Sequence, residues 1–357
     1  MLGFQKIYPQ AKIVNLEVNY RCEPPIVEAA MRLIAHNEER FPKKIRAGKS
    51  GKQKVRFQYF EDCYKENAFL AEDIRQTVQN GVPLSEIAVL FRTNMQPRAL
   101  MEYMVSANLA FQTKDRIPDI YEHWIARDFF TYIRIAQGSD SRADFLSIMN
   151  RPKRYIGRDS LPDETVCFDE WMKLYEEQPW IAERIEKLWY DLKHLSRLSP
   201  YAAINYIRRG IGYDDYLAEY AEYRNANKED FYEVADEILA SAKGYRTFEE
   251  WFAHIEEYRQ ELKKLAQEKR RNQNAVTFAT LHSAKGLEFT KVYLIDVNEG
   301  VMPYKKAVLK QDVEEERRLF YVGMTRAKES LTICSVKKMR GKEVELSRFI
   351  KEAGKEP

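Results

Sequence analysis

Residues 275–297 read AVTFATLHSAKGLEFTKVYLIDV and indicate the fold more clearly than any other stretch of the chain. The runs at 275–282 and 291–297 are apolar and rich in β-branched side chains, which is typical of buried strands. Parallel sheets with helices on both faces contain such strands. This stretch therefore predicts an α/β domain.

Strand and helix patterns alternate on both sides of this stretch. The other expected strands are AKIVNLEV (11–18), KVRFQYF (54–60), EIAVLFRTN (86–94), LAFQTKD (109–115) and SLTICSV (330–336). The expected helices are PPIVEAAMRLIAHNEE (24–39), NAFLAEDIRQTVQNG (67–81), PRALMEYMVSAN (97–108) and EEERRLFYVGMTRAKE (314–329). The alternation predicts a parallel, doubly covered sheet.

The middle of the chain has a different pattern. Residues 116–271 contain long, aromatic-rich helical segments, such as HWIARDFFTYIRIAQ (123–137), and almost no strand signal. Trp and Phe recur there at helical spacing, which is typical of a core. The sequence thus predicts one α/β lobe, residues 1–115 and 272–357, interrupted by a mainly α-helical inserted domain at 116–271.

Composition describes a heavily charged globular protein. Of the 357 residues, 45% are hydrophobic and 32% charged, and the net charge is only +3 from 58 basic and 55 acidic side chains. Basic residues cluster instead, with eight Lys or Arg and no acid from residue 40 to 56 and further runs at 151–158 and 268–274. Such runs are more often solvated loops than binding sites.

The four cysteines are scattered without CxxC spacing or paired histidines, so neither a metal site nor a disulfide framework is expected. No segment has the apolar length of a membrane span, and residues 1–10 lack the apolar core of a signal peptide. We therefore expect no metal, no membrane partner and a cytoplasmic location.

The stretch AGKSGK (47–52) resembles the end of a phosphate-binding P-loop. The full P-loop pattern needs a glycine where Lys43 stands, and it needs a buried strand in front, where the sequence is instead polar and contains Pro42. We interpret the stretch as a basic loop, and the chain contains no other candidate P-loop.

Two segments carry polar chemistry next to apolar structure. The turn in TLHSAKGLEF (280–289) gathers hydroxyl groups, an imidazole, a cation and a carboxylate, which suit a phosphate or nucleotide contact, although an ordinary polar loop fits equally well. EEERRLFYVGMTRAKE (314–329) places Arg317, Arg318, Arg326 and Lys328 beside an apolar stripe. An arginine there can present its planar fork to a phosphate, and pairing with Glu314–Glu316 is the alternative.

Four motifs, in order and spacing, resemble those of the superfamily 1 DNA helicases of the UvrD/PcrA/Rep family. They are VNYR (18–21), VLFRTN (89–94), TLHSAKGLEF (280–289) and EEERRLFYVGMTRAK (314–328). The long helical gap between the second and third motifs is also similar to that family, and the resemblance spans nearly the whole chain.

The resemblance implies a P-loop NTPase-type motor of two RecA-like lobes with ATP and Mg²⁺ in the cleft between them. This chain resembles only the second lobe and its insertion, without a P-loop or Mg²⁺-binding acid of its own. It is therefore expected to be the C-terminal portion of an ATP-dependent 3′-to-5′ helicase whose partner is the missing N-terminal lobe. Alone, it is expected to bind no cofactor and to lack ATPase activity.

The resemblance also implies residue roles at the ATP cleft. Tyr20 would stack on adenine, while Arg21 and Arg326 would reach the γ-phosphate as catalytic arginines. Lys285 would point to the terminal phosphate and Glu288 to the ribose.

Single-stranded DNA is the second ligand that the resemblance implies, and Arg92, Asn94, Thr280 and His282 would hold its backbone. In the insertion, RPKRYIGRDSL (151–161) resembles the family's GIG turn, which grips duplex phosphates with backbone amides, so Arg154 and Gly157 would contact a single-strand/duplex junction. Tyr155 replaces the first glycine of that turn. GIGYDD (210–215) is a weaker candidate, because its two aspartates would repel phosphate.

Two hypotheses remain open from the sequence. The chain is either the motor portion of a helicase or a non-catalytic module that binds DNA or a helicase partner. A P-loop encoded upstream of Met1 would favour the first, and so do the γ-phosphate residues, for which a binding module has no use. The sequence indicates no particular pathway, such as DNA repair.

Overall fold

The computed structural model describes residues 7–10, 12, 14–40, 43–51, 53, 55–115, 119–268 and 274–354. The chain divides into two compact units: unit 1 comprises residues 1–118 and 261–357, and unit 2 comprises residues 119–260. The sequence placed the same two divisions at 115/116 and 271/272. The second division falls within one helix, α12 (Phe248–Glu268), and residues 269–273 of the expected basic run lie outside the described residues.

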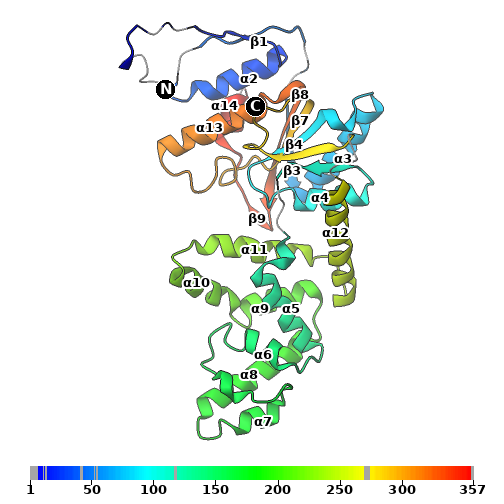
Figure 1. The fold of residues 1–357 in the computed structure, drawn as a ribbon, viewed down its shortest axis with the longest axis vertical. Helices are drawn as coiled ribbons and strands as arrows, with labels where there is room; N and C mark the ends of the chain where they lie inside the picture. The colour runs from blue at the N-terminus through cyan, green and yellow to red at the C-terminus, as the bar shows by residue number, and fades with distance from the viewer. Residues whose placement is uncertain are drawn as a thin grey trace. The chain divides into compact units, whose positions relative to one another are not determined.

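Unit 1 contains a mostly parallel sheet, drawn in Figure 1. Its strands are β3 (Arg56–Asp62), β4 (Ile87–Phe91), β5 (Phe111–Thr113), β6 (Val276–Thr280), β7 (Phe289–Leu294), β8 (Ala327–Met339) and β9 (Lys342–Glu343). Among the described residues the order is β3-β8-β7-β4-β6-β5, every neighbouring pair is parallel, and β9 pairs antiparallel with the end of β8. The predicted α/β parallel sheet is confirmed.

Helices cover both faces of this sheet (Figure 1). The helices of unit 1 are α2 (Pro24–Ala35), α3 (Cys63–Gln79), α4 (Arg98–Ser106), α13 (Lys310–Met324) and α14 (Arg348–Ala353), with a 3₁₀ turn η1 (Leu84–Glu86) before β4. Alternate residues of β4 face opposite sides: Leu90 packs with α2, α13 and α14, and Val89 packs with α3 and α4. All five residues of β4 are buried, as is expected of a central parallel strand.

Two short elements depart from the prediction. The expected strand at 11–18 is wrong in its described part, because only Val18–Asn19 (β1) pairs there, with Arg46–Ala47 (β2). The helix expected at 314–329 instead ends at Met324. Ala327 already pairs with Phe289 as the first residue of β8, so the helix has to end before it. Arg326 therefore lies in the short connection between α13 and β8.

Unit 2 is helical, as the pattern predicted. Its elements are η2 (Ile120–Glu122), α5 (Trp124–Ala136), α6 (Arg142–Ile148), η3 (Arg158–Ser160), α7 (Phe168–Lys173), α8 (Pro179–Leu195), α9 (Pro200–Arg209), α10 (Tyr213–Tyr223), α11 (Lys228–Ser241) and the first part of α12. Trp171 and Trp251 are buried in its core, whereas Trp180 is 49% exposed. No helix in the described part of the chain is long and apolar enough to cross a membrane.

Candidate nucleotide and nucleic-acid site

The turn between β6 and β7 is held by Asp115, a residue that the sequence analysis missed. Its carboxylate accepts hydrogen bonds from Thr280 N (2.7 Å), from Thr280 Oγ1 (3.2 Å) and from the Ser283 hydroxyl. Thr280 Oγ1 in turn accepts a hydrogen bond from Ser283 N at 3.1 Å. Thr280 is only 9% exposed, so its side chain serves mainly to fix the turn.

The other polar side chains of this turn reach solvent. His282, Lys285 and Glu288 are exposed, and Gly286 adopts φ 89°, in the left-handed region that favours glycine. Within the described residues, neither His282 nor Lys285 has a side-chain hydrogen bond or ion pair. The turn therefore offers an imidazole and an ammonium group to a ligand.

Arg21 and Arg326 meet around one residue, Thr325, although they are far apart in sequence. Arg21 Nη1 donates to Thr325 O at 3.4 Å, and Arg326 Nη2 donates to Thr325 Oγ1 at 3.3 Å. Arg21 Nε also donates to Glu288 Oε2 at 2.7 Å. This hydrogen bond lowers the pKa of Glu288 below its usual value. The structure thus brings together three residues that the sequence assigned to the ATP cleft.

Arg326 is held by neutral groups rather than by an acid. Its Nε donates to Val322 O and its Nη1 to Leu287 O, each at 3.0 Å. Burial lowers the pKa of the Arg326 guanidinium, and the nearby charge of Arg21 lowers it further. Two positive groups beside a single exposed carboxylate leave net positive charge, which favours an anion.

Tyr20 immediately precedes Arg21 in the chain and is 76% exposed. The side-chain oxygen of Asn19 accepts hydrogen bonds from Arg21 N (2.9 Å) and Cys22 N (3.0 Å), which fixes the backbone after Tyr20. Gly48, from the AGKSGK stretch, lies against the tyrosine ring, because a Cβ there would be 2.7 Å from Tyr20 Cδ1. The glycine thus permits a close approach between this loop and the exposed ring.

The remaining cations of the 314–329 segment are paired with acids. Arg317 donates to both carboxylate oxygens of Glu352, at 2.6 and 2.8 Å. Arg318 pairs with Glu314 and Glu315 on its own helix, as the alternative interpretation predicted. Lys328 pairs with Glu86 at 2.6 Å. Of these four cations, Arg326 is the one without a carboxylate partner in the described part of the chain.

The turn after β4 holds Arg92 and Asn94. Arg92 makes a bidentate ion pair with Glu316 of α13, at 2.8 and 2.9 Å, and its guanidinium lies over the Tyr304 ring, 5.0 Å from the centroid. The Gln96 side-chain oxygen accepts hydrogen bonds from the backbone N of residues 92 and 93. Asn94 Oδ1 is buried and has no donor among the described residues. To contact the DNA backbone, Arg92 would have to break its ion pair with Glu316 or bind a phosphate and Glu316 at the same time.

A buried pair of acids supports this turn. Gln96 Nε2 donates to Asp296 Oδ2 (3.3 Å), and Asp296 N donates to Glu66 Oε1 (3.2 Å). Burial raises the pKa of Glu66 well above its usual value, and the nearby Asp296 raises it further. Asp296 is thus part of the packing behind the turn, consistent with a structural role.

Replacing Glu66 with glutamine is expected to abolish part of the pH dependence of stability. Because the folded-state pKa of Glu66 is raised, the unfolded chain releases this proton at lower pH, and the wild-type unfolding free energy falls as the pH rises above about 4.5. Glu66→Gln should be more stable than wild type by about 1–3 kcal/mol at pH 8 and nearly equal to it at pH 4. Chemical denaturation at both pH values measures this difference, with Glu72→Gln on the same helix as an exposed control. A stability difference that is the same at pH 4 and pH 8 would contradict it.

In unit 2, Arg154 and Gly157 already make hydrogen bonds within the protein. Arg154 is 7% exposed, and its guanidinium donates to Ile148 O, Met149 O and Tyr132 Oη. The Gly157 N–H donates to the Tyr175 hydroxyl at 3.3 Å. Both groups bond within the protein, so contact of Arg154 or Gly157 with a single-strand/duplex junction stays a prediction, and it would require these hydrogen bonds to be shared or broken.

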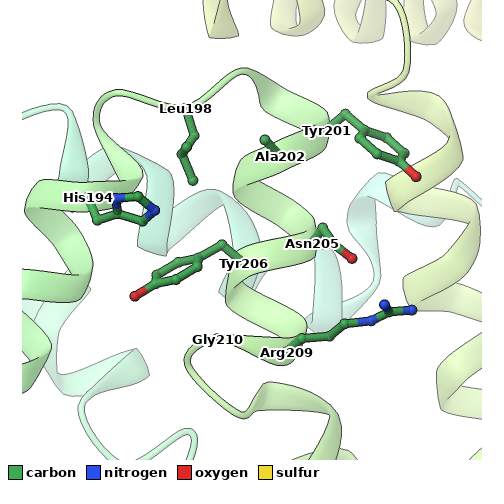
Figure 2. Close-up of a pocket in the computed structure, with 8 residues that line it drawn as sticks. All are labelled: His194, Leu198, Tyr201, Ala202, Asn205, Tyr206, Arg209 and Gly210. Atoms are coloured by element: carbon green, nitrogen blue, oxygen red, sulfur yellow. The ribbon is translucent and has the colours of Figure 1, made fainter.

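A shallow hollow of about 460 Å³ lies between α8 and α9 (Figure 2). His194 and Tyr206 lie edge to face there, with ring centroids 4.6 Å apart. The Tyr206 hydroxyl donates to Asp191 at 2.7 Å, and burial together with this carboxylate raises the pKa of Tyr206 to about 12. Gly210, the first residue of the weaker candidate GIGYDD, lines this hollow, whereas the residues assigned to ATP and to single-stranded DNA do not.

A parallel α/β lobe whose chain is interrupted between β5 and β6 by a helical unit defines the class of this protein. Comparison with protein families identifies it further. The chain belongs to the UvrD-like helicase C-terminal domain family, whose model matches residues 14–166 and 170–338. The family predicted from the four motifs is therefore confirmed.

Curated relatives cover the same region. The chain is 28% identical to the putative ATP-dependent DNA helicase YjcD of Bacillus subtilis, over 98% of this chain and 47% of that protein. It is 30% identical to the ATP-dependent DNA helicase PcrA of Staphylococcus epidermidis, over 99% of this chain and 51% of that protein. The chain thus spans about half the length of these relatives.

A solved structure, the C-terminal domain of a possible DNA helicase from Lactobacillus plantarum WCFS1, aligns over 94% of this chain and 95% of that one. Its sequence identity is 10% and its TM-score is 0.37, a value too low to bear on the fold.

Proposed function

We propose that this chain is the C-terminal motor portion of an ATP-dependent DNA helicase and supplies the arginine side of an ATP site shared with a P-loop lobe. The observation that carries the proposal is the meeting of Arg21 and Arg326 at Thr325. The relatives named as ATP-dependent DNA helicases support the choice of ATP as the anion.

The hydrogen-bond inventory of the two arginines supports a role in phosphate binding. A guanidinium has five N–H groups. Arg326 uses three of them, on Val322, Leu287 and Thr325, and Arg21 uses two, on Glu288 and Thr325. The remaining N–H groups are available to the γ-phosphate, where arginine stabilises the charge that develops during phosphoryl transfer.

The neighbouring side chains fit the rest of the nucleotide. The exposed Tyr20 ring offers a face for adenine. Lys285 is an exposed cation, which we assign to the terminal phosphate. Glu288 Oε2 holds Arg21, and we assign Oε1 to a ribose hydroxyl. In the described part of the chain no cluster of three or more acids, histidines or cysteines is placed to hold a metal, so we assign Mg²⁺ to the nucleotide and the P-loop lobe.

Single-stranded DNA is the proposed second ligand, on the segment that also approaches ATP. His282 is exposed at one end of the β6–β7 turn, and Lys285 and Glu288 lie at its other end. Thr280, Arg92 and Asn94 adjoin the same strand ends, since β4 and β6 are paired in parallel. A rigid turn that contacts both ligands would couple nucleotide state to DNA affinity, with 3′-to-5′ movement as the direction that the resemblance implies.

The 357-residue chain alone is expected to show no ATP turnover above background, with or without single-stranded DNA. The physical reason is that its residues stabilise the γ-phosphate from one side and include no P-loop to bind the phosphates from the other. Phosphate release by a purified sample measures this, with heat-denatured chain as the blank. Turnover that persists through purification and is lost in Arg326→Ala would show that the chain contains a complete site and would overturn the proposal.

A further inference from the structure

The turn before η3 in unit 2 displays an exposed cluster of aromatic and cationic side chains. Tyr155 is 56% exposed and Trp180, on α8, is 49% exposed, with ring centroids 6.4 Å apart. The guanidinium of Arg184 lies 5.2 Å from the Tyr155 centroid and 4.9 Å from the Trp180 centroid. Lys153 Nζ lies 4.6 Å from the Tyr155 centroid. We call these four residues the aromatic platform.

The backbone beneath Tyr155 is fixed from several sides. The Asn150 side chain accepts hydrogen bonds from Arg154 N and Ile156 N and donates to Ile156 O at 2.8 Å. Arg184 Nη1 donates to Arg154 O at 3.0 Å. Tyr155 adopts φ 60°, a left-handed conformation that is unfavourable for a bulky residue. Such strain persists only where the surroundings impose it, so the turn holds the Tyr155 ring in an exposed position.

The cations of the platform lack the ion pairs that hold several arginines of unit 2. Four arginines of this unit form ion pairs with aspartates: Arg134 with Asp144, Arg151 with Asp128, Arg208 with Asp214 and Asp236, and Arg259 with Asp119. Within the described residues, Lys153 and Arg184 pair with no acid. Their positive charge is therefore not neutralised by the protein, and it lies beside two exposed ring faces.

These observations specify the chemistry of a ligand. An anionic group suits the two cations, and a flat apolar group suits the rings, because cations already beside the rings repel a cationic ligand. Unpaired nucleotides combine both properties, since every base has a stacking face and every linkage a phosphate. A phosphate grip by backbone amides does not fit, because the N–H groups of Arg154 and Ile156 donate to Asn150 and that of Gly157 donates to the Tyr175 hydroxyl.

We propose that Lys153, Tyr155, Trp180 and Arg184 form a stacking site for an unpaired base of single-stranded DNA. The base stacks on the Tyr155 or Trp180 ring, and Lys153 and Arg184 neutralise the adjoining phosphates. The choice of DNA as the ligand rests on the proposed function, whereas the stacking chemistry rests on the platform itself.

The test is binding of the 357-residue chain to fluorescein-labelled oligothymidylate, followed by anisotropy. Tyr155→Gly and Trp180→Ala should each weaken binding by about 5- to 150-fold, the range expected for loss of one stacked base. Tyr155→Phe should bind like wild type. Tyr155→Gly also relieves the positive φ, so its melting temperature should equal or exceed that of wild type, which separates lost stacking from misfolding.

An abasic oligonucleotide of the same length separates stacking from charge. On it, wild type and Tyr155→Gly should bind equally, because no base is present to stack. Tyr223→Ala removes another exposed tyrosine of unit 2 and serves as the control, with no change expected on either oligonucleotide. If Tyr155→Gly weakened binding to both oligonucleotides equally, the stacking site would be overturned. The same holds if the platform variants weakened only competition by an unlabelled acidic peptide and left oligothymidylate binding unchanged.

The outcome is independent of the proposed ATP function. If all platform variants bind oligothymidylate like wild type, the platform is refuted, while the dependence of ATP turnover on Arg21 and Arg326 is untouched. If the chain binds no single-stranded DNA at all, both the platform and the proposed DNA grip are refuted.

Discussion

Replacing Arg326 with alanine is expected to lower kcat for ATP hydrolysis by about 10³-fold or more in a polypeptide that joins this chain to a P-loop lobe. Arg326 is buried, lacks a carboxylate partner among the described residues and keeps two N–H groups unused. Its charge is thus available in the transition state, where a fixed guanidinium contributes most. Steady-state phosphate release with saturating single-stranded DNA measures kcat.

Two controls make this result specific. Arg318→Ala removes a neighbouring arginine that pairs with Glu314 and Glu315 on its own helix and should leave kcat within about twofold of wild type. Arg326→Lys keeps the charge but not the planar fork and should recover only a small part of the rate. If Arg326→Ala instead weakened DNA binding as much as it lowered kcat, Arg326 would be a DNA contact or a structural residue.

Replacing Arg317 with alanine is expected to destabilise unit 1 by about 3–5 kcal/mol, because removing one partner of a buried ion pair leaves the other uncompensated. The Arg317 and Glu352 side chains are 8% and 14% exposed, and Arg317 also donates to Asn37 Oδ1 at 2.6 Å. These contacts tie α13 to α14 and to the end of α2. The unfolding free energy from urea denaturation measures the loss.

The adjacent arginine again supplies the matched comparison. Arg318→Ala should cost about 1 kcal/mol, since its side chain is 38% exposed, its partner Glu315 is 74% exposed, and its buried partner Glu314 keeps hydrogen bonds from the backbone N of residues 38 and 39. Similar losses for the two variants would contradict the assignment of Arg317 as the buried tie and Arg318 as a surface pair.

Local pattern was sufficient for most of the fold. Period-two and continuous apolar runs predicted β3 to β8, and the helix expected at 67–81 ends next to Gly81, whose positive φ (93°) favours glycine. The errors occur where long-range pairing decides the structure. The helix expected to run to residue 329 ends at Met324, because Ala327 pairs with Phe289 in the sheet. The described residues 12 and 14–17 belong to no strand.

The candidate site was predictable only in part. Motif resemblance indicated Arg21, Glu288 and Arg326, and the structure brings these residues together. It did not indicate Asp115, which lies 165 residues from Thr280 and contacts it only because β5 and β6 are neighbours in the sheet. No local pattern encodes such a contact.

Arg154 shows that a sequence does not reveal whether a basic side chain is exposed. A basic run in sequence predicts positive charge at a surface, yet Arg154 lies inside the turn, where four acceptors hold its guanidinium. Its neighbour Tyr155 is the exposed residue. Whether a cation in such a run serves a ligand or its own turn depends on which acceptors the fold brings near, and only the structure shows this.

The central claim is that this chain provides one half of a shared ATP site, and one comparison tests it most directly. Phosphate release would be measured, with oligothymidylate present, for the chain alone, for a P-loop lobe alone, and for a polypeptide that joins the two. The account predicts rapid turnover only in the joined polypeptide, and its loss when both Arg21 and Arg326 are replaced with alanine. Turnover by the chain alone, or a joined polypeptide no faster than the P-loop lobe alone, would contradict it.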